Sequence, residues 1–320
     1  MNKTSTIGKD ITQAKKILDA NHVIGIPTET VYGLAGNAFD VKAVSRIFEV
    51  KKRPSFDPLI VHTHSIEALK EFVTEIPEQA LLLARAFWPG PLTLLLPKKN
   101  SIPDLVTSGL ERVAVRIPNH PLTLELLKSL SYPLAAPSAN PFGYISPTTA
   151  QHVADQLGKD IEYILDGGPC EVGVESTIVG WENGIATVMR VGGLSIEAIE
   201  HIIGPVNVQT VSSSNPAAPG MLKSHYAPKI TMILGNIDAL ISEHTGKKIA
   251  VLSFQKAYPS VAKNYILTPT GDTTEAAQHL FAAMRELDTY DADIIITELA
   301  PNTGLGRAIN DRLKRACAKE

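Results

Sequence analysis

Polar side chains gather at the end of a short apolar run near the N-terminus. Residues 23–26 (VIGI) have the pattern of a buried strand, and residues 27–34 (PTETVYGL) then place two threonines, a glutamate and a tyrosine in a turn that Pro27 opens and Gly33 closes. Loops at strand ends often form the ligand sites of α/β proteins. A surface turn would have the same composition, but similar clusters beside later strand-like runs favour a binding site.

Two later clusters carry cations. In residues 51–62 (KKRPSFDPLIVH), three cations precede a proline-bounded loop and a strand that ends at His62. Lysine and arginine at a loop suit a polyphosphate, although cations are also favoured at the end of a helix. The other is residues 108–118 (SGLERVAVRIP), in which Arg116 lies inside a predicted strand and is flanked by apolar residues. A buried charge of this kind must be paired or must hold a ligand, so a structural salt bridge and a binding role both remain open.

Three further clusters lie at residues 134–141, 174–179 (VESTIV) and 189–192 (MRVG), and the first of them combines small and neutral polar residues. Residues 134–141 (LAAPSANP) allow close backbone approach, and Ser138, Asn140 and Ser146 offer neutral hydrogen bonds, which suits a phosphate or a nucleotide. The sequence contains no GxxxxGK[ST], GxSxG, HExxH or CxxC motif. Cations, hydroxyls and amides with few carboxylates indicate a site that binds and aligns anionic or zwitterionic ligands without a covalent intermediate on the protein.

The elements that must position these clusters follow from periodicity. Helical stripes are predicted near residues 10–20, 40–50, 121–130 and 148–157, and strands near residues 59–61, 92–96, 113–115, 161–165 and 185–191. Strands and helices do not alternate strictly, so residues 1–205 are expected to form an α/β domain with a mixed, twisted sheet.

A second domain is expected after a linker. Residues 206–229 form the predicted linker, because residues 211–220 are rich in Ser, Pro and Gly; the following MLKSHYAP segment carries a Lys, a His and a Tyr that a plain linker does not need. Residues 230–320 resume alternation of strands and helices, which predicts a small Rossmann-like α/β domain. No GxGxxG follows its first strand, so dinucleotide binding is not supported.

Charge and cysteine content narrow the class of protein. Residues 1–205 hold 18 Lys and Arg against 22 Asp and Glu, a balance of −4, whereas domains that mainly grip nucleic acid are usually basic. The two cysteines, Cys170 and Cys317, are far apart, which predicts a reducing cytoplasm and neither a disulfide framework nor a zinc site. No apolar run approaches the roughly 18 residues of a membrane span.

Seven motifs in order resemble one family. PTETVYGL, KKRPSFDPLIVH, WPGPLT, VAVRIP, APSAN, GVESTIV and RVGG resemble the YrdC-like threonylcarbamoyl-AMP synthases, and SHYAP with GLGRAINDRLKRA resembles the two-domain members. The resemblance runs from about Ile7 to the C-terminus. It implies a nucleotidyltransferase that converts L-threonine, bicarbonate and ATP into L-threonylcarbamoyladenylate and diphosphate with Mg²⁺. The product would feed a separate tRNA threonylcarbamoyl transferase complex, with tRNA as a further candidate partner.

The resemblance also implies site residues. Threonine contacts would fall on Thr30, His62, Arg116, Ala136 (through its backbone) and Ser176. ATP contacts would fall on Lys51, Arg53, Asp57, Arg112, Ser138, Asn140, Ser146, Arg190 and Tyr226, with Tyr226 as a lid from the linker. Lys51 and Arg53 would align substrates and stabilise charge, no residue would act as a nucleophile, and Mg²⁺ would be held mainly by ATP phosphates.

Two positions depart from the family pattern. Asp57 stands where asparagine is expected, and such a carboxylate would repel phosphates unless it is paired or binds Mg²⁺. Arg112 stands where threonine is frequent, so it would either add a phosphate contact or be exposed. The alternative function is a double-stranded RNA or tRNA-binding module without turnover. A third is a carbamoyl-adenylate enzyme of hydrogenase maturation, whose acylphosphatase and zinc-finger regions are not visible in this sequence.

Overall fold

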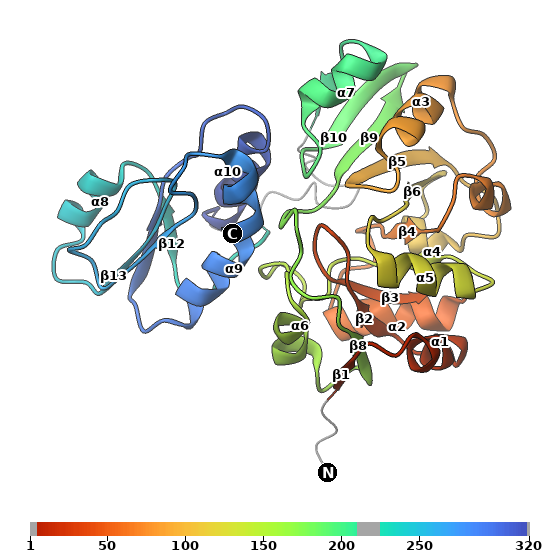
Figure 1. Ribbon diagram of the computed structural model, residues 1–320, viewed down its shortest axis with the longest axis horizontal. Coiled ribbons are helices and arrows are strands. Elements are labelled where there is room, and N and C mark those ends of the chain that lie inside the picture. Colours follow the sequence, from red (N-terminus) through yellow and green to blue (C-terminus); the bar gives the residue numbers. More distant parts are fainter. Residues whose placement is uncertain (1–4, 210–224, 319–320) are drawn as a thin grey trace.

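The computed structural model describes residues 5–209, here called the N-terminal part, and residues 225–318, called the C-terminal part. Residues 210–224 of the predicted linker lie outside the described residues. Figure 1 shows the two parts side by side. Helices α9 (Thr273–Thr289) and α10 (Gly306–Ala316) of the C-terminal part face the N-terminal part. The predicted domain limits, 1–205, 206–229 and 230–320, stay predictions.

The N-terminal part is built on one mixed sheet with the strand order β1-β8-β2-β3-β7-β4-β6-β5-β9-β10-β11. The sheet contains parallel pairs, such as β4 with β6, and antiparallel pairs, such as β5 with β6, which confirms the expected mixed sheet. The strands are β1 (Thr6–Gly8), β2 (Ile24–Ile26), β3 (Gly33–Asn37), β4 (Ile60–His62), β5 (Leu92–Pro97), β6 (Arg112–Arg116), β7 (Leu134–Ala135), β8 (Tyr163–Leu165), β9 (Thr177–Glu182), β10 (Ile185–Arg190) and β11 (Asn207–Val208).

Helices cover this sheet, and their starts follow local capping chemistry. The Asp10 carboxylate accepts hydrogen bonds from the backbone amides of Thr12 and Gln13, and Asp40 caps the next helix in the same way. The buried stripe of that second helix, which includes Val44 and Ile47, packs on the sheet. The helices are α1 (Ile11–Asp19), α2 (Val41–Lys51), the 3₁₀ helix η1 (Glu67–Glu71), α3 (Glu78–Phe87), α4 (Asp104–Thr107), α5 (Pro121–Ser129), α6 (Ala150–Leu157) and α7 (Ile196–Ile203).

The C-terminal part has a second, smaller sheet. Its four strands run parallel in the order β12-β15-β13-β14, which confirms a Rossmann-like α/β arrangement. The elements are β12 (Met232–Leu234), α8 (Ile237–Glu243), β13 (Ile249–Ser253), β14 (Lys263–Ile266), α9 (Thr273–Thr289), β15 (Ile294–Thr297) and α10 (Gly306–Ala316).

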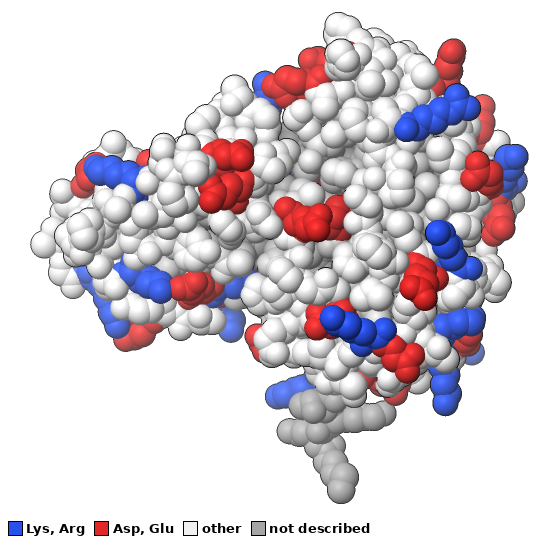
Figure 2. Space-filling view, viewed as in Figure 1, with Lys and Arg blue, Asp and Glu red and all other residues white. Residues whose placement is uncertain are grey.

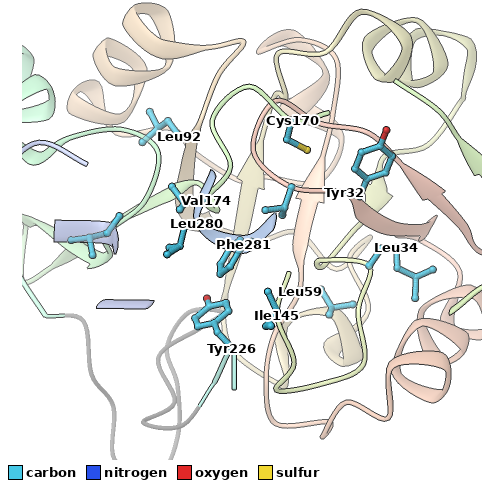
Figure 3. Packing of buried hydrophobic residues seen from close by; sticks show 14 of the residues in the cluster. Tyr32, Leu34, Leu59, Leu92, Ile145, Cys170, Val174, Tyr226, Leu280 and Phe281 are labelled. Carbon is cyan, nitrogen blue, oxygen red and sulfur yellow. The ribbon is translucent and has the colours of Figure 1, made fainter. Parts of the chain in front are cut away.

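The two parts share a buried core. Tyr226, Leu280 and Phe281 belong to the same apolar cluster as Ile145 and Val174 of the N-terminal part (Figure 3). The rings of Tyr226 and Phe281 stack with their centroids 5.4 Å apart. Because apolar burial is the main favourable term in association, this cluster fixes α9 against the N-terminal part.

Polar contacts extend the same interface. The Tyr144 hydroxyl donates a hydrogen bond of 2.5 Å to Asp288, and Arg285 donates to the backbone oxygen of Ser146 at 3.1 Å. Within the ranges 5–209 and 225–318, none of the helices combines the length and the apolar character needed to cross a bilayer.

Candidate functional site

One cavity collects residues from all six polar clusters and from the segment after the linker. The parallel register of β4 and β6 pairs His62 with Arg116, so these two strand-end residues lie side by side at one edge of the cavity. The cavity is lined by Thr28, Val31, Gly33, Arg53, Pro58, Ile60, His62, Arg116, Ala136, Pro137, Ser138, Glu175, Ser176, Arg190, His225 and Tyr226. Clusters that are separated by up to about half of the chain therefore build one site.

Arg116 is both paired and part of the cavity wall. It is 4% exposed, and its guanidinium lies 2.8 Å from the carboxylate of Glu29 and donates to the Gly90 carbonyl at 3.2 Å. These two partners fix the plane of the guanidinium. An arginine held in this way presents its remaining N–H donors in a fork that fits a carboxylate.

The loop that carries Arg53 explains the unusual Asp57. The two side chains form a buried ion pair of 2.8 Å, and Arg53 also donates to the backbone oxygens of Asp57 and Pro58 at 3.0 and 2.8 Å. The sequence left ion pairing or Mg²⁺ binding open for Asp57, and the structure shows the ion pair. Its charge is balanced by the same arginine that lines the cavity.

Lys51 acts on the cavity from behind its wall. The side chain is 1% exposed, and its ammonium donates hydrogen bonds of 2.5 Å to the backbone oxygens of both Ser138 and Asn140. Burial, followed by the charge of Arg53, lowers the pKa of Lys51 well below its usual range. The ammonium group thus holds the loop that brings Ser138 to the cavity.

Glu175 is the carboxylate of the cavity wall. It accepts hydrogen bonds from the Ser146 hydroxyl at 2.6 Å and from Arg312 of α10 at 2.9 Å. Burial acts to raise its pKa, but Arg312 and Arg190 outweigh burial and lower the pKa of Glu175 to about 2. Arg190 in turn donates to the backbone oxygen and the hydroxyl of Ser176 at 2.9 and 3.1 Å.

Acid titration should report on this carboxylate. The folded pKa of about 2 lies below the ordinary value of 4.5, so Glu175 contributes its stabilisation above about pH 4.5 and loses it as the pH falls toward 2. We expect Glu175→Gln to flatten the fall in the free energy of unfolding over this range in denaturant titrations. Glu171→Gln, which changes an exposed carboxylate, is the control. Equal pH dependence in both variants and the parent chain would contradict the assignment.

Two imidazoles in the cavity are neutral at pH 7. Burial, and then the charge of Arg116, lowers the pKa of His62 to about 3. Burial is also the main cause that lowers the pKa of His225 to about 3. The Nδ1 atoms of both residues are buried and have no hydrogen-bond partner among the described residues.

Tyr226 lines one side of the cavity. Its backbone has a φ of 65°, and its ring packs edge-on against His225 with the centroids 4.2 Å apart. The Arg312 guanidinium lies 5.1 Å from the centre of the same ring. Burial raises the pKa of Tyr226 to about 12, so the hydroxyl stays protonated.

The structure brings eight of the predicted site residues to the cavity. They are Arg53, His62, Arg116, Ala136, Ser138, Ser176, Arg190 and Tyr226. Five others are buried and do not line it. Lys51, Asp57 and Ser146 contact lining residues directly, as described above. Thr30 shares a hydrogen bond of 2.8 Å with Thr28, and Asn140 donates to the backbone oxygens of Pro141 and Tyr144 at 2.9 and 2.8 Å.

Arg112 lies away from the cavity. It pairs with Glu182 at 2.8 Å, at the start of the strand whose end carries Arg116. Four residues of strand separate the two backbone positions by roughly 13 Å. The sequence left a phosphate contact or an exposed position open for Arg112. The structure agrees with a partly exposed position.

Five polar residues around the site were not among the predicted site residues. Thr28, Glu175 and His225 line the cavity, Glu29 pairs with Arg116, and Arg312 contacts Glu175. Glu29 and Glu175 each stand among apolar residues and hydroxyls, which is a signal that could have marked them. Arg312 has no such signal, because it lies in a run of charges (NDRLKR) that resembles a solvated helix face.

Family models match both parts of the chain. Residues 16–192 match the Sua5_yciO_yrdC model, described as "Telomere recombination", and residues 194–318 match "Threonylcarbamoyl-AMP synthase, C-terminal domain". A threonylcarbamoyl-AMP synthase of Pyrococcus abyssi is 42% identical over 92% of this chain and 90% of its own length. One of Bacillus subtilis is 42% identical over 98% of this chain and 94% of its own.

A solved structure agrees with these matches. Pyrococcus abyssi Sua5 in complex with L-threonine has a TM-score of 0.93 and 39% sequence identity, covering 98% of both chains. The order of the motifs, the two-part fold and near full-length similarity agree. The chain belongs to the threonylcarbamoyl-AMP synthase family.

Proposed function

We propose that this chain forms L-threonylcarbamoyl-AMP and diphosphate from L-threonine, bicarbonate and ATP, the first step of threonylcarbamoyladenosine modification of tRNA. The observation that carries the proposal is the meeting of Arg53, Arg116 and Arg190 with neutral imidazoles and hydroxyls in one cavity. Such a set can hold a carboxylate and a polyphosphate together without a protein nucleophile. The names of the near full-length relatives support the same reaction.

Arg116 holds the threonine carboxylate in this proposal. Its orientation by Glu29 and Gly90 leaves a fork for the ligand, and the parallel register places His62 beside it. Ser176 lies close enough to Arg190 to link the amino-acid end to the nucleotide end. Thr30 supports Thr28 from behind, and Ala136 offers its backbone.

Arg53, Arg190 and Ser138 hold ATP. The amine of threonine combines with bicarbonate to give a carbamate and water, and a carbamate oxygen attacks the α-phosphorus while diphosphate leaves. The carbamate is the nucleophile, so the chain aligns the reactants and stabilises the negative charge that develops on phosphate oxygens. Lys51 contributes by holding the Ser138 loop.

In this proposal, Mg²⁺ binds together with ATP. Among the described residues, no group of three or more His, Cys, Asp or Glu side chains could hold a metal ion. A hard cation with few protein ligands is usually carried by phosphate oxygens and water. Mg²⁺ would supply charge neutralisation at the phosphates, and the arginines of the cavity complement it.

Tyr226 acts as the lid residue. Its buried ring packs against His225, Phe281 and Arg312, and in this proposal it shields the cavity from solvent on one side. We expect Tyr226→Ala to raise the ratio of AMP to intact adenylate severalfold, because water then reaches a hydrolysable mixed anhydride. Chromatography of the products measures this ratio. Tyr258→Ala, which does not change a lining residue of the cavity, is the control, and an unchanged ratio in Tyr226→Ala would contradict the lid role.

An RNA-binding module without turnover is the second candidate. Cations and carboxylates are interspersed on the face shown in Figure 2, with no large basic area on it, which gives that candidate little support. Transfer of the product to a tRNA threonylcarbamoyl transferase complex, direct contact with tRNA and a cytoplasmic location remain part of the proposal. The two free cysteines fit the last of these.

Diphosphate release tests the function. The full chain is incubated with ATP, Mg²⁺ and bicarbonate, with and without L-threonine, and diphosphate and the adenylate are measured. Release that requires both threonine and bicarbonate supports the synthase. Folded protein that binds RNA in a salt-dependent manner, but releases no diphosphate, would favour the second candidate.

A further inference from the structure

The C-terminal part places one fully buried arginine directly behind the wall of the cavity. Arg312 of α10 is 0% exposed, and its Nε donates to the Glu175 carboxylate at 2.9 Å. Its second contact is the ring of Tyr226, 5.1 Å from the guanidinium carbon. Its third is Asp311, whose carboxylate also accepts from Arg315 at 3.0 Å. Two of these three partners line the cavity.

The contact with Glu175 has an electrostatic consequence. In the proposed reaction, three phosphates of ATP enter a cavity whose wall contains this carboxylate. An ionised Glu175 would repel them, and the repulsion is strong in a buried site because solvent screening is weak there. Arg312 pairs with Glu175 on the side away from the cavity and offsets its negative charge. The attraction between the phosphates and the cations Arg53 and Arg190 is then reduced little by Glu175.

We propose that Arg312 is a positioning residue of the ATP site, through which the C-terminal part tunes nucleotide binding. It neutralises Glu175 and holds the Tyr226 ring over the cavity. The inference rests on the proposed function, because it assigns the phosphates of ATP to this cavity, and it gives the C-terminal domain a role in the reaction beyond stabilising the fold.

Other arginines of the C-terminal part form hydrogen bonds and ion pairs with the N-terminal part and do not line the cavity. Arg285 donates to the backbone oxygens of Ile145 and Ser146. Arg307, on the same helix as Arg312, forms an ion pair with Glu197 of α7. The interface therefore keeps polar ties when Arg312 is changed, and Arg307 provides a matched control: it has the same chemistry, the same helix and an ion pair between the same two parts.

The test separates nucleotide binding from threonine binding. Calorimetry on the full chain measures the dissociation constants of Mg²⁺–ATP and of L-threonine in turn. We expect Arg312→Met to weaken ATP binding by about tenfold or more while threonine binding changes less than about twofold, because Glu175 then loses its ion-pair partner and only Arg190 offsets its charge. Arg307→Met is expected to change neither constant.

A second variant keeps the inference falsifiable when Arg312→Met folds poorly. Glu175→Gln together with Arg312→Met removes both charges and is expected to recover most of the lost ATP affinity, since the repelling group is gone. A merely structural role of Arg312 predicts no such recovery. ATP affinity equal to the parent chain in Arg312→Met, or no recovery in the double variant, would overturn the inference.

The outcome is distinguishable from failure of the proposed function. A parent chain that releases no diphosphate with threonine and bicarbonate would remove the synthase. ATP binding by the same chain would still report on Arg312, because the calorimetric comparison does not depend on turnover.

Discussion

Replacing Arg116 with alanine is expected to raise the L-threonine concentration for half-maximal diphosphate release by about 100-fold, because truncating one partner of a buried charged pair costs about 2–5 kcal/mol. The ligand carboxylate would lose its bidentate donor, whereas the ATP requirement should change little. Steady-state kinetics with threonine and ATP varied in turn measures both effects.

Two further variants make the Arg116 result specific. Arg112→Ala removes the same side chain from the start of the same strand, where it pairs with Glu182 outside the cavity, so normal threonine dependence is expected. Arg116→Lys keeps a cation beside Glu29 and protects the fold, but it lacks the planar fork and should still bind threonine weakly. If both Arg116 variants require the same threonine concentration as the parent chain, the threonine carboxylate does not bind at Arg116.

Replacing Lys51 with methionine is expected to lower kcat/KM for ATP by about 10–100-fold, since two buried hydrogen bonds, each worth roughly 0.5–1.5 kcal/mol, are lost from one loop. Methionine fills a similar volume, so the change removes the ammonium group and little packing. The loop that carries Ser138 would lose its anchor at both Ser138 and Asn140. Kinetics at saturating threonine isolates the nucleotide effect.

Lys52 is the matched control for Lys51. It is the next residue, it is exposed, and Lys52→Met removes an identical charge without touching the loop. A direct phosphate contact by Lys51 would make Lys51→Arg partly active, whereas an anchor buried in a tight site should reject the larger guanidinium. Equal kinetics for Lys51→Met and the parent chain would contradict the anchoring role.

Much of the fold could be predicted because its signals are local. The N-cap carboxylates Asp10 and Asp40 stand directly before apolar stripes, and α1 and α2 begin there. The expected strand over residues 92–96 is found as β5. Short or weakly patterned strands were harder to predict, and β14 was not expected. Every residue of β14 is partly buried, so its sequence lacks the alternation of apolar and polar residues that marks a strand with one buried face.

The sequence by itself determined which residue types and motifs this protein brings to its site, and in which order, because loops at strand ends are marked by local Pro, Gly and polar patterns. It did not distinguish Arg116, in the cavity, from Arg112 of the same strand, or residues that line the cavity from those, like Lys51, that support it. Only the tertiary structure decided this. The pairing of Glu175 with Arg312 joins residues 137 positions apart, and it depends on how α10 packs against the N-terminal part. No local pattern encodes a contact that forms only when two distant segments of the chain pack against each other.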